Sequence, residues 1–520
     1  MKINLKTKTM NTLAKGCVFV LGISFFTACT EENVLDLEPY NQVSEDAAFS
    51  TPALIELSLT GMYNAAQRGD YNGQGRGYPF GAASIQQGDN RGEDVVNTQT
   101  FYMLTYTGTY DPSTANNVYM WSDTYRLINR ANIVIDGVTK AIAAGVISQE
   151  VGDDYIGQAK FMRAIAHLEL ISHFGKPYEH SAGSNANLGI PYREIPFTTE
   201  ENIEIGIAQG RNTVDEVYTK IIADLNDAEA TLATKAERGG TAGIVRATQE
   251  AAIAYKTRAY LHMREWQNVI NEGEKILGAY ALTEDPNDVF ANGYNNSESI
   301  FSMENTANNN PGVNAALGSQ YNRRALVVIS PIVWRNEYWL PNDLRRSEDL
   351  VSMRSGIPHT NKYKDDVNYS DATPLMRYAE VLLNMAEAYA RLDNLDDALD
   401  LLNEVRDRSL PDGVASYSAF GSKEDLLRAI IGERRIEFVM EGKRWQDIHR
   451  LQFDTFVDYD GVPAKVENGY QPAAAYTLGT PYTGPYGVEA IPYSDYRFLW
   501  PIPQQEMNNN PNMVQNPGWE

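Results

Sequence analysis

Apolar residues recur every three to four positions in several long stretches of this chain, which is the spacing of helices that bury one face. Thr213 precedes Val214 and is followed three residues later by Glu216, the capping-box pattern that begins a helix. The pattern predicts amphipathic helices over 46–67, 117–145, 150–174, 212–233, 245–278, 374–392, 395–408 and 423–451. We therefore expect a mainly α protein.

The composition changes between 280 and 372. Asn, Gly and Pro are frequent there and surround short segments typical of strands, such as 299–303 and 325–329. The tail after 452 is mostly loop, and no stretch has the composition of a linker between independent domains. We expect a single domain over 46–520. Its expected parts are a helical scaffold (46–278 and 373–451), a loop-rich insert (279–372) and a C-terminal coil (452–520).

A faint internal repeat lies within the predicted scaffold. The residues Ala386, Tyr389, Ala398, Leu402 and Val405 share their spacing with Thr257, Tyr260, Val269, Gly273 and Ile276. This spacing matches the tetratricopeptide pattern, in which small residues let two helices approach and a tyrosine fills the groove between pairs. The repeat predicts a tetratricopeptide-like scaffold whose units are dispersed along the chain.

The first residues have the character of a secretory signal. Four lysines precede an apolar run of about eleven residues, from Gly16 to Phe26, and small residues lead to Cys29. The run is shorter than the roughly 20 residues that a membrane-spanning helix needs. We predict a signal peptide over 1–28. An ordinary soluble secretion signal, with Cys29 after Ala28 by coincidence, is the alternative.

Charge and cysteine usage narrow the function classes. The formal charge of the whole chain is −24, and residues 1–28 contribute four lysines and no acid, so the mature chain is still more acidic. Nucleic acids and anionic lipids bind clustered Lys and Arg, so such a chain is a poor partner for them. The only cysteines are Cys17 and Cys29, which leaves no disulfide in an exported chain. Its stability must come from the core.

Several motifs, in order along nearly the whole chain, resemble the SusD/RagB family of nutrient-uptake outer-membrane lipoproteins. They are 158–175 with 189–191, 211–218 with 222–228, 377–387, 431–437 with 441–447, and 499–506 with 510–511 and 515–518. The resemblance implies a SusD-like fold, capture of a carbohydrate, and a TonB-dependent β-barrel of the SusC kind as partner. In that family the lipoprotein closes over the outer mouth of the barrel.

The start of the mature chain also resembles bacterial lipoproteins. Phe-Thr-Ala-Cys is similar to a lipobox, which implies that Cys29 carries the acyl chains and that 29–45 is a lipidated tether. The acidic residues just after Cys29 resemble the signal for export to the outer face. The implied location is the outer membrane, lipid-anchored and facing the cell surface.

The most specific of these motifs, Glu433-Arg434-Arg435-Ile436-Glu437, interleaves charges with apolar residues at helical spacing. The pattern suits a helix that packs on one side and forms ion pairs on the other. A catalytic cluster is the alternative. We expect a structural role, with the arginines anchoring carboxylates or carbonyls of the C-terminal coil.

Catalytic and metal motifs do not stand out. The chain has no Gly-x-Ser-x-Gly elbow, P-loop or His-Glu-x-x-His motif. Neighbouring acids such as Glu93/Asp94 and Asp365/Asp366 are weak candidates for a glycosidase pair, because adjacent loop residues point different ways. His167 and His173 are six apart and do not form a zinc motif. We expect no enzyme activity, cofactor or metal, and leave calcium open.

Holding a sugar requires aromatic platforms and a few polar groups on loops that a rigid scaffold supports. The chain has 31 Tyr and 7 Trp, and two loop-like stretches combine aromatics with polar residues: 70–110 and 334–339. By resemblance, the family's glycan contacts come from loops after the first helix and from the insert. The residues predicted to bind ligand are Tyr71, Tyr78, Asp89, Arg91, Tyr102, Tyr106, Trp334 and Tyr338.

Three other functions remain as alternatives to oligosaccharide capture. RagB-like members of the family look suited to peptides. A glycoside hydrolase would require two working carboxylates. A scaffold that binds only proteins is the third, because tetratricopeptide stacks often do so.

Overall fold

The computed structural model describes residues 45–69, 75–179, 186–291, 295–457 and 459–520. Cys29, the predicted signal peptide 1–28, nearly all of the tether 29–45, and Tyr71 lie outside these residues. Among the described residues, no helix is both long enough and apolar enough to cross a membrane.

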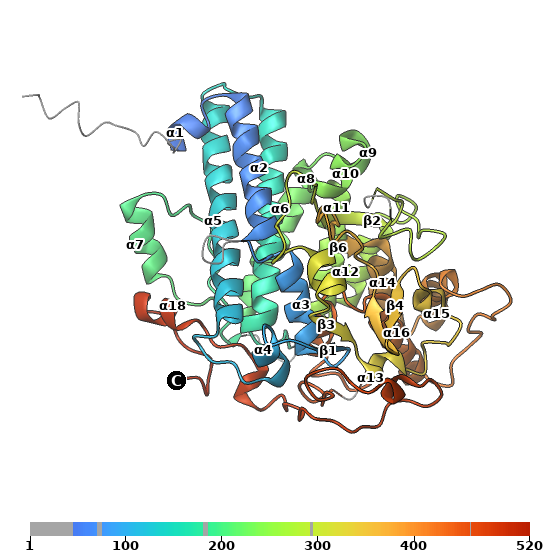
Figure 1. Ribbon diagram of the computed structural model, residues 1–520. Coiled ribbons are helices and arrows are strands. Elements are labelled where there is room, and N and C mark those ends of the chain that lie inside the picture. The colour runs from blue at the N-terminus through green and yellow to red at the C-terminus, as the bar shows by residue number, and fades with distance from the viewer. Residues whose placement is uncertain (1–44, 70–74, 180–185, 292–294, 458) are drawn as a thin grey trace, which may run out of the picture.

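The prediction of a mainly α protein is confirmed, since helices form most of the regular structure (Figure 1). The helices are α1 (Glu45–Ala48), α2 (Pro52–Arg68), α3 (Ala82–Arg91), α4 (Met103–Thr107), α5 (Ala115–Ala143), α6 (Gln149–Phe174), α7 (Glu200–Ala208), α8 (Val214–Thr231), α9 (Lys235–Arg238), α10 (Ala242–Val245), α11 (Gln249–Met263), α12 (Trp266–Glu274), α13 (Pro331–Trp334), α14 (Tyr378–Arg391), α15 (Leu395–Arg408), α16 (Lys423–Glu437), α17 (Arg444–Arg450) and α18 (Gln504–Asn509).

The helices α2, α5 and α6 run side by side as the tallest part of the molecule, and α8 packs on α6 (Figure 1). Side-chain caps begin several of them. Thr51 accepts from the N–H of Leu54 at the start of α2, and the predicted capping box of Thr213 and Glu216 is present at the start of α8. Each cap satisfies a backbone N–H that the first helical turn leaves without a partner.

The predicted repeat corresponds to two stacked helix pairs, α11/α12 and α14/α15, with α12 packed on α14. A Cβ at Gly273 would overlap the side chain of Met385, so the glycine allows the close approach of α12 and α14. The hydroxyl of Tyr389 donates to Glu274 of α12 at 3.1 Å. The tyrosine therefore joins the two pairs, as the tetratricopeptide pattern predicted.

Three of the predicted helices are interrupted by turns. The range 245–278 breaks at Arg264, which has φ 60°, and 423–451 breaks between α16 and α17 at Met440 and Gly442, with φ 66° and 75°. The range 46–67 breaks between α1 and α2, where Thr51 caps the second helix. The left-handed conformation of Arg264 and Met440 is uncommon outside glycine, so residue type at these two positions did not indicate the turns.

Short antiparallel strand pairs lie in and beside the insert. The strands are β1 (Val95–Asn97), β2 (Ser299–Met303), β3 (Val327–Ile329), β4 (Val351–Arg354), β5 (Ile357–Thr360) and β6 (Thr373–Arg377). Their pairs are β1 with β3, β2 with β6, and β4 with β5. The predicted strand 299–303 is confirmed, and the piece 325–329 forms a strand only from Val327 onward.

The motif in α16 is buried on nearly all sides, not on one. Glu433 and Glu437 pair with Arg345 of the insert, Arg434 pairs with Asp447 of α17, and Arg435 pairs with Asp94 beside β1. The expectation that these arginines anchor the C-terminal coil was therefore wrong. Their partners come from α17 and from the segment around β1, so the motif joins the scaffold to the loop regions.

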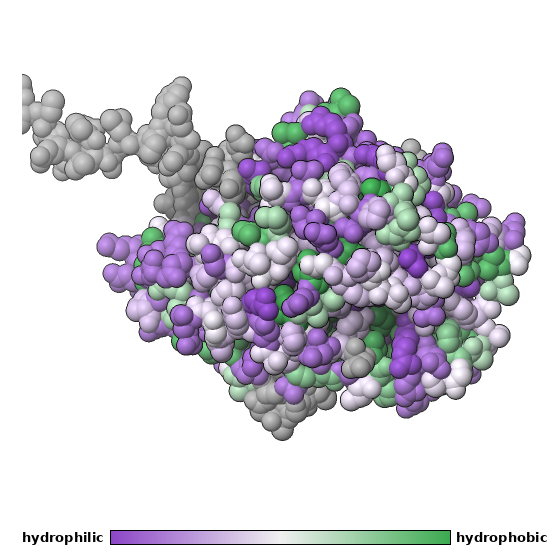
Figure 2. All heavy atoms as spheres, turned by 60° about the horizontal axis from the view of Figure 1, so that its bottom comes forward, coloured by the Kyte–Doolittle hydropathy of each residue, from purple (hydrophilic) through white to green (hydrophobic). Residues whose placement is uncertain are grey.

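The C-terminal coil runs along the lower side of the molecule (Figure 1). Asn516 holds its end, because the side-chain amide donates to the carbonyls of Phe174 at 2.9 Å and Trp500 at 2.7 Å. Seen from below, apolar residues form separate groups among polar ones on this face (Figure 2).

Candidate ligand-binding site

Two parts of the chain expected to bind ligand, the stretch 70–110 and the insert 279–372, are joined because β1 pairs with β3, from Val95 opposite Ile329 to Asn97 opposite Val327. The pairing continues one residue further, where the N–H of Thr98 donates to the carbonyl of Leu326 at 3.0 Å. The segment that follows β1 is thereby held against the insert. Loops from both stretches can form one surface.

Three of the tyrosines predicted to contact a ligand are buried: Tyr78, Tyr102 and Tyr106 are 1%, 0% and 0% exposed. The hydroxyl of Tyr102 donates to Oε1 of Gln320 at 3.2 Å, and that of Tyr106 donates to the carbonyl of Val466 at 2.8 Å. Burial raises the pKa of both hydroxyls, which therefore stay protonated donors. These rings pack the interior and offer no surface to a ligand in this structure.

Asp89 and Arg91 lie in α3, a polar helix of 10 residues that are all buried, not in a loop as the sequence suggested. Asp89 accepts from the hydroxyl of Tyr321 at 2.6 Å and from the N–H of Gly442 at 2.8 Å. Burial raises the pKa of Asp89 to about 7. The guanidinium of Arg91 stacks 3.3 Å from the ring centroid of Trp445. Both residues attach α3 to the scaffold.

Trp334 is also buried, and its indole N–H donates to the carbonyl of Tyr476 at 3.1 Å. The guanidinium of Arg346 lies 4.2 Å from its ring centroid. This tryptophan fastens the C-terminal coil to the insert. Tyr338 is half-buried, with its ring beside Gly432 of α16, and it is the one predicted residue among those described that keeps an accessible side chain.

Six of the predicted residues pack within the protein, and their burial does not favour the expected direct contact with a ligand, which stays a prediction: Tyr78, Asp89, Arg91, Tyr102, Tyr106 and Trp334. The physical reason is common to all six: each is buried, and its polar atoms or ring have partners within the chain. Tyr338 and Tyr71 stay predictions, the latter because it lies outside the described residues.

Accessible aromatic, guanidinium and amide groups, which are the groups that bind sugars, lie around the buried Tyr102. Phe101 is half-buried, and the guanidinium of Arg76 lies 4.9 Å from its ring centroid. Arg324 is exposed and donates to Oδ1 of Asn314 at 3.0 Å. Tyr102 links these two pairs: its ring packs edge-on against Phe101 with 4.7 Å between centroids, and its hydroxyl donates to Gln320, whose amide donates to the carbonyl of Asn314.

A second pair of an aromatic ring and an arginine lies nearby. Its arginine is Arg323, the last residue of a π-helical turn (Gly318–Arg323) that Arg324 directly follows. Arg323 is exposed, and its guanidinium lies 6.0 Å from the ring centroid of Tyr369, whose hydroxyl accepts from it at 3.5 Å. We define the loop face by its residues: Arg76, Phe101, Asn314, Arg323, Arg324 and Tyr369. It combines two rings, three guanidinium groups and an amide.

A cavity of about 320 Å³ lies behind the loop that carries Tyr369, lined by Phe290, Tyr363 and Asp371 among others. Burial raises the pKa of Asp371 to about 6. A Cβ at Gly318 would overlap the carbonyl oxygen of Asp365, so this loop rests directly on the π-helical turn. The cavity and the loop face are therefore neighbours across one loop.

Comparisons with known proteins agree with this architecture. The model of the SusD family matches residues 332–519, and a second model, described as starch-binding and associating with the outer membrane, matches residues 33–261. A SusD-like protein of Formosa agariphila is 23% identical, covering 96% of this chain and 97% of its own length. A crystal structure of a SusD superfamily protein from Bacteroides fragilis is 28% identical and superposes with a TM-score of 0.73, covering 89% of this chain and 99% of that one.

The chain belongs to the SusD-like family. A SusD-like carbohydrate binding protein from Bacteroides vulgatus, 21% identical, shares the fold with a TM-score of 0.71 over 89% of this chain and 98% of that one. The two family models together reach from the segment before α1 to the C-terminal coil.

This SusD-like protein has a further hollow of about 240 Å³ between α5 and α18, lined by rings of Trp121, Tyr125 and Phe197. Its polar groups already hold the fold together. Glu506 of α18 accepts from the indole N–H of Trp121 at 3.3 Å and from Arg193 at 3.2 Å. The loop face, whose arginines are exposed at 323 and 324, is therefore the stronger candidate.

Proposed function

We propose that this SusD-like protein captures an oligosaccharide on the loop face and passes it to a SusC-like TonB-dependent transporter. The observation that carries the proposal is the accessible ring of Phe101 beside the guanidinium of Arg76 and the pair of Arg324 and Asn314. An aromatic ring covers the C–H face of a sugar, and guanidinium and amide groups bind its hydroxyls. Weak capture suits a protein that must release its ligand again.

The proposed place of action is the outer membrane, at the cell surface. Support comes from the family description, which names association with the outer membrane, and from the lipobox-like sequence before Cys29. Lipidation of Cys29 would supply two or more acyl chains, which is what stable anchoring requires. The TonB-dependent partner follows from the family resemblance.

Binding is a better account than hydrolysis. Glu93 and Asp94, one of the carboxylate pairs considered from the sequence, are buried and held by Arg444 and Arg435. Among the described residues, no three His, Cys, Asp or Glu side chains gather in a way that could hold a metal ion. The burial of Glu93 and Asp94 is the observation that favours capture over hydrolysis.

Titration calorimetry of the mature chain with Cys29→Ser tests the proposal. The titrants are neutral and acidic oligosaccharides of several linkages and a mixture of short peptides, with chromatography of each mixture to detect cleavage. The proposal predicts micromolar-to-millimolar binding of one oligosaccharide class with no cleavage. Binding of peptides alone would replace it with the peptide-capture alternative, and cleavage abolished by one Asp or Glu substitution would replace it with a hydrolase.

A further inference from the structure

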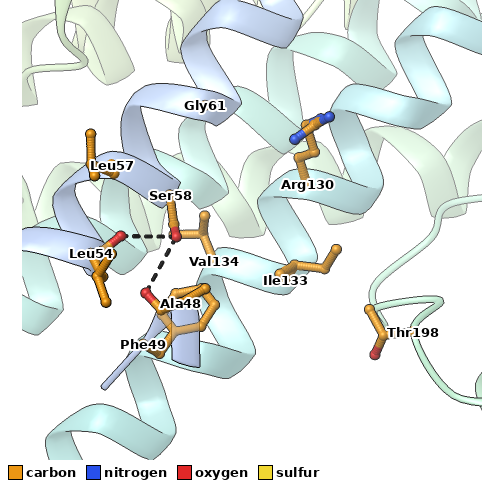
Figure 3. Close-up of a pocket in the computed structure, with 10 residues that line it drawn as sticks. All are labelled: Ala48, Phe49, Leu54, Leu57, Ser58, Gly61, Arg130, Ile133, Val134 and Thr198. Atoms are coloured by element: carbon orange, nitrogen blue, oxygen red, sulfur yellow. Dashed lines mark hydrogen bonds between the residues drawn. The ribbon is translucent and has the colours of Figure 1, made fainter. Parts of the chain in front are cut away.

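A cavity of about 410 Å³ lies between α1, α2 and α5, at the end of the molecule where the described chain begins (Figure 1). Figure 3 shows its lining, which is mostly apolar and includes Phe49, Leu57, Ile133 and Val134. Leu57 is 65% exposed at its rim. An open apolar hollow of this kind is suited to apolar side chains.

The polar groups of the cavity favour an occupant that carries an acidic group. The hydroxyl of Ser58 is already engaged, because it donates to the carbonyl of Leu54 at 3.0 Å, within α2 (Figure 3). Arg130 lies at the edge of the cavity, is exposed, and forms no hydrogen bond or ion pair with any residue that the structure describes. A complementary occupant would combine apolar side chains with a carboxylate.

The cavity is kept open by a glycine within a helix. A Cβ at Gly61 of α2 would meet nothing within 4 Å, so this position has room for a side chain. Glycine inside a helix costs about 1 kcal/mol relative to alanine. Nothing in the packing of the described residues around Gly61 requires the glycine, which suggests that the free space itself is used.

The chain carries a segment of the required chemistry immediately before α1. Val34-Leu-Asp-Leu-Glu-Pro-Tyr40 alternates apolar and acidic residues, with Leu35 and Leu37 two positions apart. In an extended segment such residues point to one side, and Asp36 points to the other. The match of one family model begins at residue 33, so the sequence pattern of the family includes this segment.

We propose that residues 33–40 dock in the cavity between α1, α2 and α5, with Leu35 and Leu37 in the apolar hollow and an acidic neighbour beside Arg130. Leu37 precedes Glu45 by eight residues, and an extended chain covers up to about 3.3–3.6 Å per residue, so the segment has ample reach. Covalent attachment gives it an effective concentration on the order of millimolar, which favours it over a separate partner.

Docking would also fix the orientation of the molecule relative to the membrane. This consequence rests on the proposed anchor at Cys29. Leu35 lies six positions after Cys29, which limits the anchor to about 22 Å from the cavity. The end of the molecule formed by α1, α2 and α5 would then face the lipid. The docking itself does not depend on lipidation or on glycan binding.

Disulfide trapping tests the docking. The mature chain with Cys29→Ser has no cysteine, so Leu37→Cys with Leu57→Cys adds the only pair, and Leu35→Cys with Leu57→Cys covers the neighbouring position. A disulfide requires Cα atoms within about 7 Å. We expect rapid intramolecular linkage for at least one pair, detected as a linked peptide by mass spectrometry. The control pair is Leu37→Cys with Met353→Cys, which is 52% exposed on β4.

A second experiment tests the docking by filling the cavity with a larger side chain at Gly61. Gly61→Leu should lower the rate of linkage about tenfold, equivalent to about 1.4 kcal/mol, without lowering the melting temperature, and Gly61→Ala should have a smaller effect. Equal linkage at Met353, or linkage that Gly61→Leu leaves unchanged, would overturn the proposal. A disulfide between two molecules would show instead that a second copy occupies the cavity, and would also contradict it.

Discussion

Many charged side chains in this protein are buried, and the sequence does not reveal which ones. Arg377 is 2% exposed and binds three carboxylates: those of Glu298, Glu437 and Glu441. Removing one member of such a cluster leaves the others buried without a partner, which costs more than the pair contributes when intact. Asp89 and Arg91 show this difficulty. Charged residues are usually exposed, so the sequence suggested a loop, but both residues lie in the buried helix α3.

Arg377→Met is expected to lower the free energy of unfolding by about 3–5 kcal/mol, because three carboxylates lose their shared cation. Chemical denaturation followed by circular dichroism measures the change. The matched control is Arg428→Met, which breaks a pair with Asp425 that is 52% exposed on both sides, and this change should stay within about 0.5 kcal/mol. Equal effects of the two substitutions would show that burial of the cluster does not matter.

A buried lysine should make stability depend on pH. Lys465 donates to the carbonyls of Asn90 at 2.6 Å and Tyr106 at 3.0 Å, and burial lowers its pKa to about 7. Between this value and the unfolded value of about 10.4 the unfolded chain binds the additional proton, so this group makes stability rise with pH by up to about 1.4 kcal/mol per pH unit.

Lys465→Met should remove that slope between pH 7 and 10. The measurement is the free energy of unfolding of both proteins at several pH values in this range. The difference between them should change steadily with pH, and parallel curves would contradict the lowered pKa of Lys465.

At the scale of elements, the amphipathic spacing predicted the long helices well. It did not predict the turns that interrupt them or the places where two helices approach closely. The capping box at Thr213 and the tetratricopeptide spacing were readable because both depend on residue type at fixed offsets. The break between α16 and α17 depends instead on a contact with α3. Gly442 lies against that helix, where a Cβ at Gly88 would overlap its carbonyl oxygen.

Two helical glycines should respond in opposite ways to alanine. Gly88→Ala should lower the melting temperature clearly, by an amount equivalent to about 1–3 kcal/mol, because backbone of the neighbouring turn blocks the new methyl group. Gly61→Ala should raise stability by up to about 1 kcal/mol, because its methyl group meets open space and alanine favours the helix. Differential scanning calorimetry compares them, and destabilisation by both would contradict the packing described here.

At the scale of the whole molecule, the family motifs were recognisable because they build the scaffold. The residues 431–437 and 441–447, for example, join α16 and α17 to the loop regions. The binding surface was predictable only as two regions, the loops after the first helix and the insert, and the pairing of β1 with β3 that joins them was not predicted. Which aromatics face outward could not be read from the sequence, since Phe101 and Tyr102 are neighbours in the chain and only Phe101 keeps an accessible ring.

The central claim is that ligand is held at the loop face, and the most direct test compares two aromatic substitutions by calorimetry with the oligosaccharide that the intact protein binds. Phe101→Ala should weaken binding about tenfold, through loss of the stacking surface, while the protein stays folded by circular dichroism. Tyr486→Ala removes a ring that is 48% exposed on the C-terminal coil and should change the affinity less than about twofold. Unchanged binding in Phe101→Ala together with weakened binding in Tyr486→Ala would place the ligand on the coil and contradict the account.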